Sequence, residues 1–119
     1  MPATFELKTN DENQYIFNFF NSQGELILMS SEYDNKEDAM QAIKEVRTGS
    51  LMSNQIAAGK VPEGDTFFVI KDATGAIIVK SVLYDSPMVF DNALHAVKDN
   101  ACVAEIVDLT EWPKDGGDY

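Results

Sequence analysis

Residues 15–47, YIFNFFNSQGELILMSSEYDNKEDAMQAIKEVR, recur in altered form and without a gap at residues 66–98, TFFVIKDATGAIIVKSVLYDSPMVFDNALHAVK. The two stretches are identical at eight of their 33 positions, each pair lying 51 residues apart. These pairs are Phe17/Phe68, Gly24/Gly75, Ile27/Ile78, Ser30/Ser81, Tyr33/Tyr84, Asp34/Asp85, Ala42/Ala93 and Val46/Val97. The spacing predicts a duplicated and fused motif. Because a unit of about 50 residues buries too little surface to be very stable alone, we expect the copies to share one core.

A hairpin is predicted at the start of each stretch. Polar turns that end in Gly24 and Gly75 separate apolar runs, and we expect both glycines to adopt positive φ. The predicted hairpin strands are Tyr15–Phe20, Glu25–Ser30, Thr66–Lys71 and Ala76–Ser81.

A helix is predicted after each hairpin, because apolar residues recur there at i, i+3, i+4 and i+7. Asp34 or Asn35 is the expected cap of the first helix, and Gly49 the expected residue just beyond its end. Ser86 is the expected cap of the second, with Pro87 in the first helical position. The two predicted buried faces are Ala39, Ala42, Ile43 and Val46, and Phe90, Ala93, Leu94 and Val97.

Further strands are predicted around these units. Phe5–Lys8 alternates as a first strand, and Val103–Leu109 follows the second helix, with a weaker equivalent near residues 54–58. Val61–Glu63 stands where the first strand of the second copy would fall, and its proline confines it to an edge or removes it.

These elements predict one α+β domain over residues 1–110. We expect two fused repeats, at about 3–58 and 60–110, which build one mainly antiparallel sheet with two helices on one face. Residues 111–119 are predicted to form a C-terminal tail, with Trp112 as its anchor.

The chain resembles the YegP-like family of small uncharacterised bacterial proteins, as a member with two copies of the motif. The resemblance covers roughly residues 4–109 and is carried by five segments of the first copy. They are Phe5-Glu6-Leu7, Tyr15-x-Phe17, Gly24-Glu25-Leu26-Ile27-Leu28, Ser31-Glu32-Tyr33 and Ala42-Ile43-x-x-Val46. It implies a β-β-β-α-β motif, repeated, in which the last strand of each copy exchanges into the other half. It implies no activity and transfers no catalytic residue.

Charge and composition argue against several classes of partner. The net charge is −11, from 20 acidic and nine basic residues, which disfavours nucleic acid and anionic membranes. The single cysteine, Cys102, allows no internal disulfide. The start of the chain lacks the features of a signal peptide, so a cytoplasmic location is expected.

Catalytic and metal-binding signatures are not recognisable in the sequence. His95 is the only histidine, and no second ligand stands at a suitable spacing, so we expect no metal and no cofactor. Cys102 is expected to be a small core residue rather than a nucleophile. The pattern therefore favours a non-enzymatic protein over an enzyme.

Two sets of residues are the candidate sites. Alternation places Phe20, Phe67 and Val69 on the sheet face that the helices do not reach. Either loops, the tail or sheet curvature cover this apolar face, or it binds a protein or a second copy of the chain. Tyr33 and Tyr84 stand at matched strand-to-helix corners, either as packing residues or as paired ligand anchors at a pseudo-twofold axis.

Two hypotheses follow. The first is an interaction module that recruits a protein through the apolar sheet face or edge. The alternative is a small-ligand-binding protein or enzyme with its site between the repeats.

Overall fold

The computed structural model describes residues 2–111, so the predicted anchor Trp112 and tail residues 112–119 lie outside the described part of the chain. Seven strands form one sheet in the order β4-β5-β6-β3-β2-β1-β7. The strands are β1 Thr4–Thr9, β2 Tyr15–Phe20, β3 Leu26–Ser30, β4 Ile56–Lys60, β5 Thr66–Lys71, β6 Ile77–Ser81 and β7 Glu105–Asp108. The helices are α1 Lys36–Gly49 and α2 Pro87–Asn100, with short 3₁₀ turns at η1 Ser53–Gln55, η2 Ala101–Val103 and η3 Leu109–Glu111.

The sheet is mixed but mainly antiparallel, as the sequence predicts. All neighbouring strands run antiparallel except β7, which lies parallel to β1 with Glu105 opposite Thr4. The last strand of the chain thus borders the first. Two contacts from α1 fasten this region, because Lys36 forms an ion pair with Asp108 and Arg47 donates a hydrogen bond to the carbonyl oxygen of Ala104.

Matching elements of the two halves lie 51 residues apart. The bounds of β2, β3 and α1, moved by 51 positions, are those of β5, β6 and α2. The register of β1 on β2 recurs in that of β4 on β5, since Phe5 pairs with Phe19 and Ile56 with Ile70. β4 is therefore the first strand of the second half.

This topology places a strand where one is expected near residues 54–58 and has none at Val61–Glu63, the second of the two outcomes expected there. Two β-β-β-α-β motifs would need eight strands, but β4 takes both the place expected near residues 54–58 and the role expected of Val61–Glu63. Val61–Glu63 instead begins the β4–β5 turn, in which Val61 N–H donates to the carbonyl oxygen of Asp65 at 2.9 Å. Gly64 closes that turn at φ 103°, a conformation that glycine adopts more readily than other residues.

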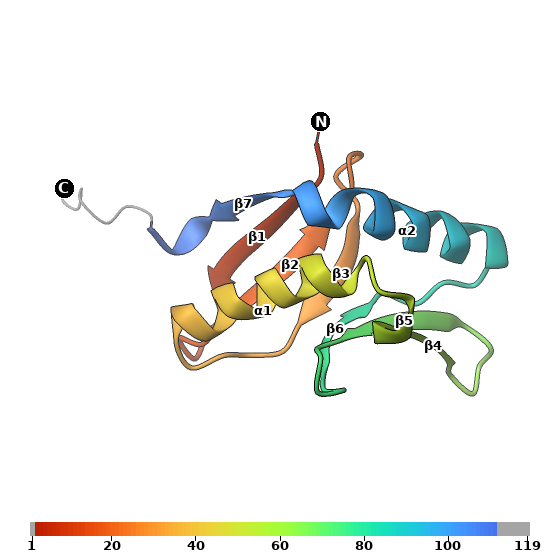
Figure 1. Ribbon diagram of the computed structural model, residues 1–119, viewed down its shortest axis with the longest axis horizontal. Coiled ribbons are helices and arrows are strands. Elements are labelled where there is room, and N and C mark those ends of the chain that lie inside the picture. Colours follow the sequence, from red (N-terminus) through yellow and green to blue (C-terminus); the bar gives the residue numbers. More distant parts are fainter. Residues whose placement is uncertain (1, 112–119) are drawn as a thin grey trace.

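The core lies between the sheet and the two helices, which cover the same sheet face (Figure 1). Phe5, Phe17, Phe19 and Phe68 are fully buried there. The predicted face of α1 is buried along its whole length, whereas in α2 Ala93 and Val97 are buried and Phe90 and Leu94 are partly buried.

A bulge in each half adds one more side chain to this core. The register of β2 on β3 shifts so that Phe19 pairs with Leu28 and Phe20 with Leu26, which leaves Ile27 unpaired. Ile27 and Leu28 are both buried despite being neighbours, as expected when a bulge turns two successive residues to one face. Ile78 is the bulged residue at the matching place between β5 and β6.

The local predictions at turns and caps are largely confirmed. Gly24 and Gly75 have φ of 80° and 94°. Asn35 caps α1 by accepting a 2.8 Å hydrogen bond from Asp38 N–H, and Ser86 caps α2 ahead of Pro87.

The predicted role of Gly49 is wrong. Gly49 is the last residue within α1, and the cap after it is Ser50 in a right-handed helical conformation. A Cβ on Gly49 would lie 2.8 Å from Ile70 Cγ2 and 3.2 Å from the carbonyl oxygen of Lys71. Glycine is therefore needed here for the close approach of α1 to β5 and not for a left-handed turn.

Candidate functional site

The sheet face opposite the helices is apolar at intervals rather than continuously. Phe20 and Phe67 lie on it, since their neighbours Phe19 and Phe68 are buried on the helix side. One row of paired residues crosses this face from edge to edge: Ala57, Val69, Lys80, Met29, Asn18, Glu6 and Val107. Charged and amide side chains thus interrupt the predicted apolar surface.

Phe67 packs against the edge strand β4 on this face. It pairs with Gly59 of the edge strand β4, and a Cβ on Gly59 would come within 2.6 Å of the Phe67 ring. Lys80 Nζ lies 4.6 Å from the centre of the same ring, a distance that allows a cation–π contact. The aromatic ring therefore shields a glycine on an exposed edge while leaving part of its surface free.

The other predicted face residues differ in exposure. Phe20 is half-buried, and Val69 is buried at 6% exposure, so Val69 offers little surface to a partner. Met29 and Ile77, which were not among the predicted site residues, are 38% and 58% exposed. Their side chains can be assigned to a face only when the bulges and strand pairing are known, and the sequence gives no direct signal of either.

Tyr33 and Tyr84 each pack at a strand-to-helix corner. Tyr33 exchanges backbone hydrogen bonds of 2.7 and 2.8 Å with Tyr15, and its ring stacks on Phe17 with centroids 6.4 Å apart. Tyr84 exchanges two backbone hydrogen bonds of 2.8 Å with Thr66, and its ring meets the edge of Phe90. Packing explains the positions of both aromatic rings. It does not explain the surroundings of the two hydroxyl groups.

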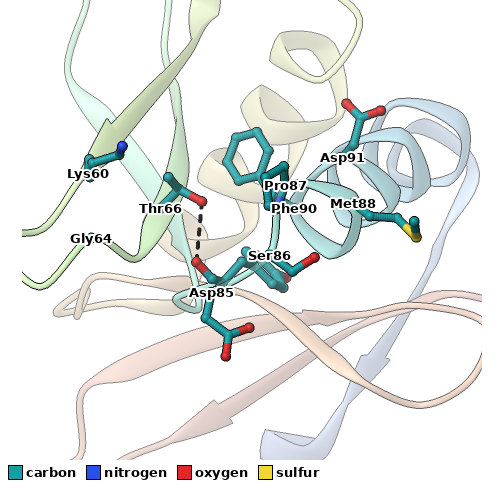
Figure 2. A pocket seen from close by; sticks show the side chains of 10 residues that line it. Lys60, Gly64, Thr66, Asp85, Ser86, Pro87, Met88, Phe90 and Asp91 are labelled. Carbon is teal, nitrogen blue, oxygen red and sulfur yellow. Dashed lines mark hydrogen bonds between the residues drawn. The ribbon is translucent and has the colours of Figure 1, made fainter.

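One hollow of about 570 Å³ lies between the β4–β5 turn and the start of α2 (Figure 2). Lys60 and Gly64 line its β side, and Pro87 and Phe90 line its helix side (Figure 2). Thr66 Oγ1 donates a 3.3 Å hydrogen bond to the Tyr84 carbonyl oxygen at its base. This bond fastens the start of α2 to β5.

A second hollow, of about 630 Å³, lies between α2 and the β2–β3 turn. It is lined by Asn21, Ser22, Gln23, Glu25, Ile27, Tyr84, Val89, Asn92, Ala93, His95, Ala96 and Asp99. We call it the Tyr84 hollow. Tyr84 is only 9% exposed, and its hydroxyl has no hydrogen-bond partner among residues 2–111. Burial, followed by the nearby Glu25 carboxylate, raises the pKa of the Tyr84 phenol.

A third hollow, of about 400 Å³, occupies the matching place in the other half, between α1 and the β5–β6 turn. We call it the Tyr33 hollow. Burial first, and then Glu45, Asp38 and Asp72, raise the pKa of Tyr33. Each of these two hollows joins the helix of one half to a turn of the other. Tyr33 and Tyr84 line separate hollows, so the structure does not bring them together at one site.

Within residues 2–111, no group of three His, Cys, Asp or Glu side chains is placed to hold a metal ion. His95 is exposed, and its Nδ1 lies 2.9 Å from the carbonyl oxygen of Asp91 one turn earlier. Cys102 is a half-buried free thiol. Neither described helix is long and apolar enough to span a membrane.

Comparisons with known proteins identify clear relatives. A family model described as a domain of unknown function, DUF1508, matches residues 10–51. A UPF0339 protein of Shewanella oneidensis is 32% identical over 110 residues, which cover 92% of this chain and 100% of the relative. The UPF0339 protein YegP of Yersinia pestis is 32% identical over 106 residues, covering 89% of this chain and 95% of the relative.

Solved structures agree with the fold. The solution structure of a UPF0339 protein from Shewanella oneidensis superposes with a TM-score of 0.90 at 31% identity, covering 95% of this chain and 96% of that one. The solution structure of yegP from Escherichia coli, described as a protein of unknown function, gives a TM-score of 0.86 at 29% identity, covering 92% and 95%.

Proposed function

This chain belongs to the UPF0339 family, and we propose that it is a non-enzymatic interaction module that binds a protein through the sheet face its helices leave open. We also propose that the chain is a duplicated two-copy domain acting in the cytoplasm. The observation that carries the interaction proposal is that both helices lie on one side, so that Phe20, Phe67 and Met29 form part of the other surface.

The chemistry of the face suggests the kind of partner. Strand alternation and pairing place Lys8, Lys71 and Lys80 on this face beside the apolar residues, and Glu6 and Glu105 at its β1–β7 edge. Although the net charge of the protein is −11, lysines outnumber carboxylates on the strands of this face. A partner surface with apolar side chains and carboxylates would complement it, because charge complementarity speeds and orients association.

The test uses Met29→Glu. Met29 is 38% exposed and pairs with Lys80, so a glutamate there can be accommodated by the fold while it repels an acidic partner. Proteins captured from a native lysate by the wild-type chain are compared with those captured by the variant. Each protein identified in this way is then titrated against the purified chain. Val103→Glu is the control, because Val103 is 76% exposed and lies in η2, outside the sheet.

We expect Met29→Glu to lose an identified partner that Val103→Glu keeps. Phe20→Glu/Phe67→Glu should lose the same partner, with circular dichroism to check folding, because Phe67 also covers Gly59. Equal binding by Met29→Glu and wild type would contradict the proposal. Light scattering on both proteins covers the case in which the partner is a second copy of the chain.

Small-ligand binding is a second candidate function. The observation in its favour is the buried Tyr84 hydroxyl without a partner, beside a hollow large enough for a small molecule. This site is on the helix side, so the two proposals can fail independently. A strict monomer that binds a small molecule there and captures no protein would favour this second function.

A further inference from the structure

We propose that the Tyr84 hollow binds a small organic cation, an alkylammonium or alkylguanidinium, whose charged end lies between Glu25 and the hydroxyl of Tyr84. The inference rests on the second candidate function and names its ligand class. It draws on three features of the hollow: an unpartnered hydroxyl, the sign of the charge around it, and an apolar wall.

The hydroxyl of Tyr84 is the first feature. Tyr84 is 9% exposed, and its oxygen is buried without a partner among the described residues. Buried polar groups almost always have a hydrogen-bond partner, so an exception calls for an explanation. Tyr33, at the matching position, is more exposed. The burial of an unpartnered hydroxyl is thus a property of one half and not of the motif.

A carboxylate that lines the same hollow acts on this hydroxyl. Glu25 is the carboxylate that acts on the ionisation of Tyr84, and Glu25 also lines the hollow. Tyr84 and Glu25 thus line one hollow together, with Glu25 contributed by the β2–β3 turn, which lies beside α2 in Figure 1. Burial and the Glu25 charge keep the phenol protonated at neutral pH, so the group can both donate and accept a hydrogen bond.

The charge of the lining is the second feature. Glu25 and Asp99 are carboxylates, whereas among residues 2–111 no lysine or arginine lines the hollow and His95 is the one basic side chain. Glu25 is held in place, because its Oε1 accepts a 2.8 Å hydrogen bond from Asn21 Nδ2. Asn21 is in turn fixed by accepting from the backbone N–H groups of Gln23 and Glu25, each at 2.9 Å. The carboxylate is thus preorganised for a cation.

The apolar wall is the third feature. Ile27, Val89, Ala93 and Ala96 line the hollow together with the polar groups. A ligand that fits both parts has an apolar body and one cationic end. An ammonium group has three N–H donors, and in this proposal one donates to the Glu25 carboxylate and another to the Tyr84 oxygen. An inorganic cation would leave the apolar wall unused.

The experiment is an NMR titration of the whole ¹⁵N-labelled chain with butylammonium chloride. Butanol and sodium butyrate are the neutral and anionic probes of the same length, and butylguanidinium chloride tests the guanidinium group. We expect butylammonium to shift the amide signals of Gln23, Glu25 and Ala93, with weaker or no shifts from butanol and butyrate.

Three variants test the roles of the residues. Because hydrogen bonds to charged groups are the strong ones, Glu25→Gln should weaken butylammonium binding about tenfold or more. Tyr84→Phe should weaken it severalfold without unfolding the protein, since the ring contacts remain. Tyr33→Phe is the matched control in the other half and should leave binding unchanged.

Four results would overturn the inference. Shifts of amide signals confined to the Tyr33 hollow would place the ligand site in the other hollow. Equal binding of butylammonium by Glu25→Gln would remove the charge argument. Binding of butanol or butyrate in the Tyr84 hollow, but not of butylammonium, would leave a ligand site in place with the wrong ligand class. Absence of shifts with every probe would count against the second candidate function itself.

Discussion

Replacing Tyr84 by phenylalanine should make this protein more stable. The Tyr84 hydroxyl is buried and has no hydrogen-bond partner among residues 2–111. A buried polar group without a partner costs about 1–3 kcal/mol of desolvation. Tyr84→Phe removes that group and keeps the ring, which meets the Phe90 ring edge-on with centroids 6.2 Å apart. We expect the free energy of unfolding to rise by about 1 kcal/mol, the lower end of that range.

Urea denaturation measures this change directly. The midpoint should rise while the slope of the transition stays constant, because the surface exposed on unfolding hardly changes. For a domain of this length, 1 kcal/mol corresponds to a rise of about 4 °C in the melting temperature. Tyr33→Phe is the matched control, since Tyr33 occupies the same corner but is more exposed, and its effect should stay within about 0.5 kcal/mol.

A destabilised Tyr84→Phe protein would refute this reasoning. A loss of about 0.5 kcal/mol or more would mean that the hydroxyl makes a favourable hydrogen bond in solution. The argument for a ligand at the Tyr84 hollow would then lose its first feature. If stability rises while butylammonium binding falls, the same hydroxyl lowers stability and serves binding, a common compromise at functional sites.

Three further changes test the fold. Gly49→Ala places a methyl group against β5. Overpacking should lower the free energy of unfolding by about 1–3 kcal/mol, and the better helix propensity of alanine should offset about 1 kcal/mol of that loss. Urea denaturation should show a net loss of stability, whereas the control Thr48→Ala, on the exposed side of α1, should be close to neutral. Asn35→Ala removes the cap of α1 and should cost about 1 kcal/mol in the same assay, and a variant as stable as wild type would contradict the capping role. Burial alone would raise the pKa of Asp108, but hydrogen bonds led by that from Lys36 lower it below its usual value. Its contribution to stability is therefore present above the ordinary carboxyl pKa of about 4 and lost as the pH falls below that value. In thermal melts from neutral pH downward, the melting temperature of Asp108→Asn should fall less steeply with pH than that of wild type. Parallel plots of melting temperature against pH for the two proteins would exclude this role.

Much of the fold could be predicted because its signals are local. The offset of 51 residues brings equivalent segments into register, and the bounds of the two helices and of β2 and β5 follow from it closely. Gly24 and Gly75 mark turns, since the positive φ they adopt is disfavoured in other residues. The buried helix faces follow from apolar spacing alone.

The failed predictions all depend on contacts that are distant in sequence. Gly49 resembles a glycine that ends a helix until β5 is placed beside it. A strand is predicted near residues 54–58, where β4 lies, but its role as the first strand of the second half is visible only from its pairing with β5.

The positions of the proposed site residues follow from the sequence only in part, for the same reason. Phe20 and Phe67 are on the predicted face, but the interruption by Lys80 depends on strand pairing across the sheet. The matched positions of Tyr33 and Tyr84 are visible in the sequence, whereas Glu25 reaches the Tyr84 hollow from the other half of the chain. No local sequence pattern predicts that residues of the two halves line the same hollow.

The parallel pairing of β7 with β1 has a consequence during translation. About 100 residues separate the two strands, and a ribosome adding roughly 5–20 residues per second needs about 5–20 s to make them. For that interval the outer edge of β1 has no neighbour, and an open edge invites pairing with another nascent chain on the same messenger RNA. Glu6 and Lys8 within β1 are charged residues of the kind that discourage such mispairing until synthesis delivers the partner strand.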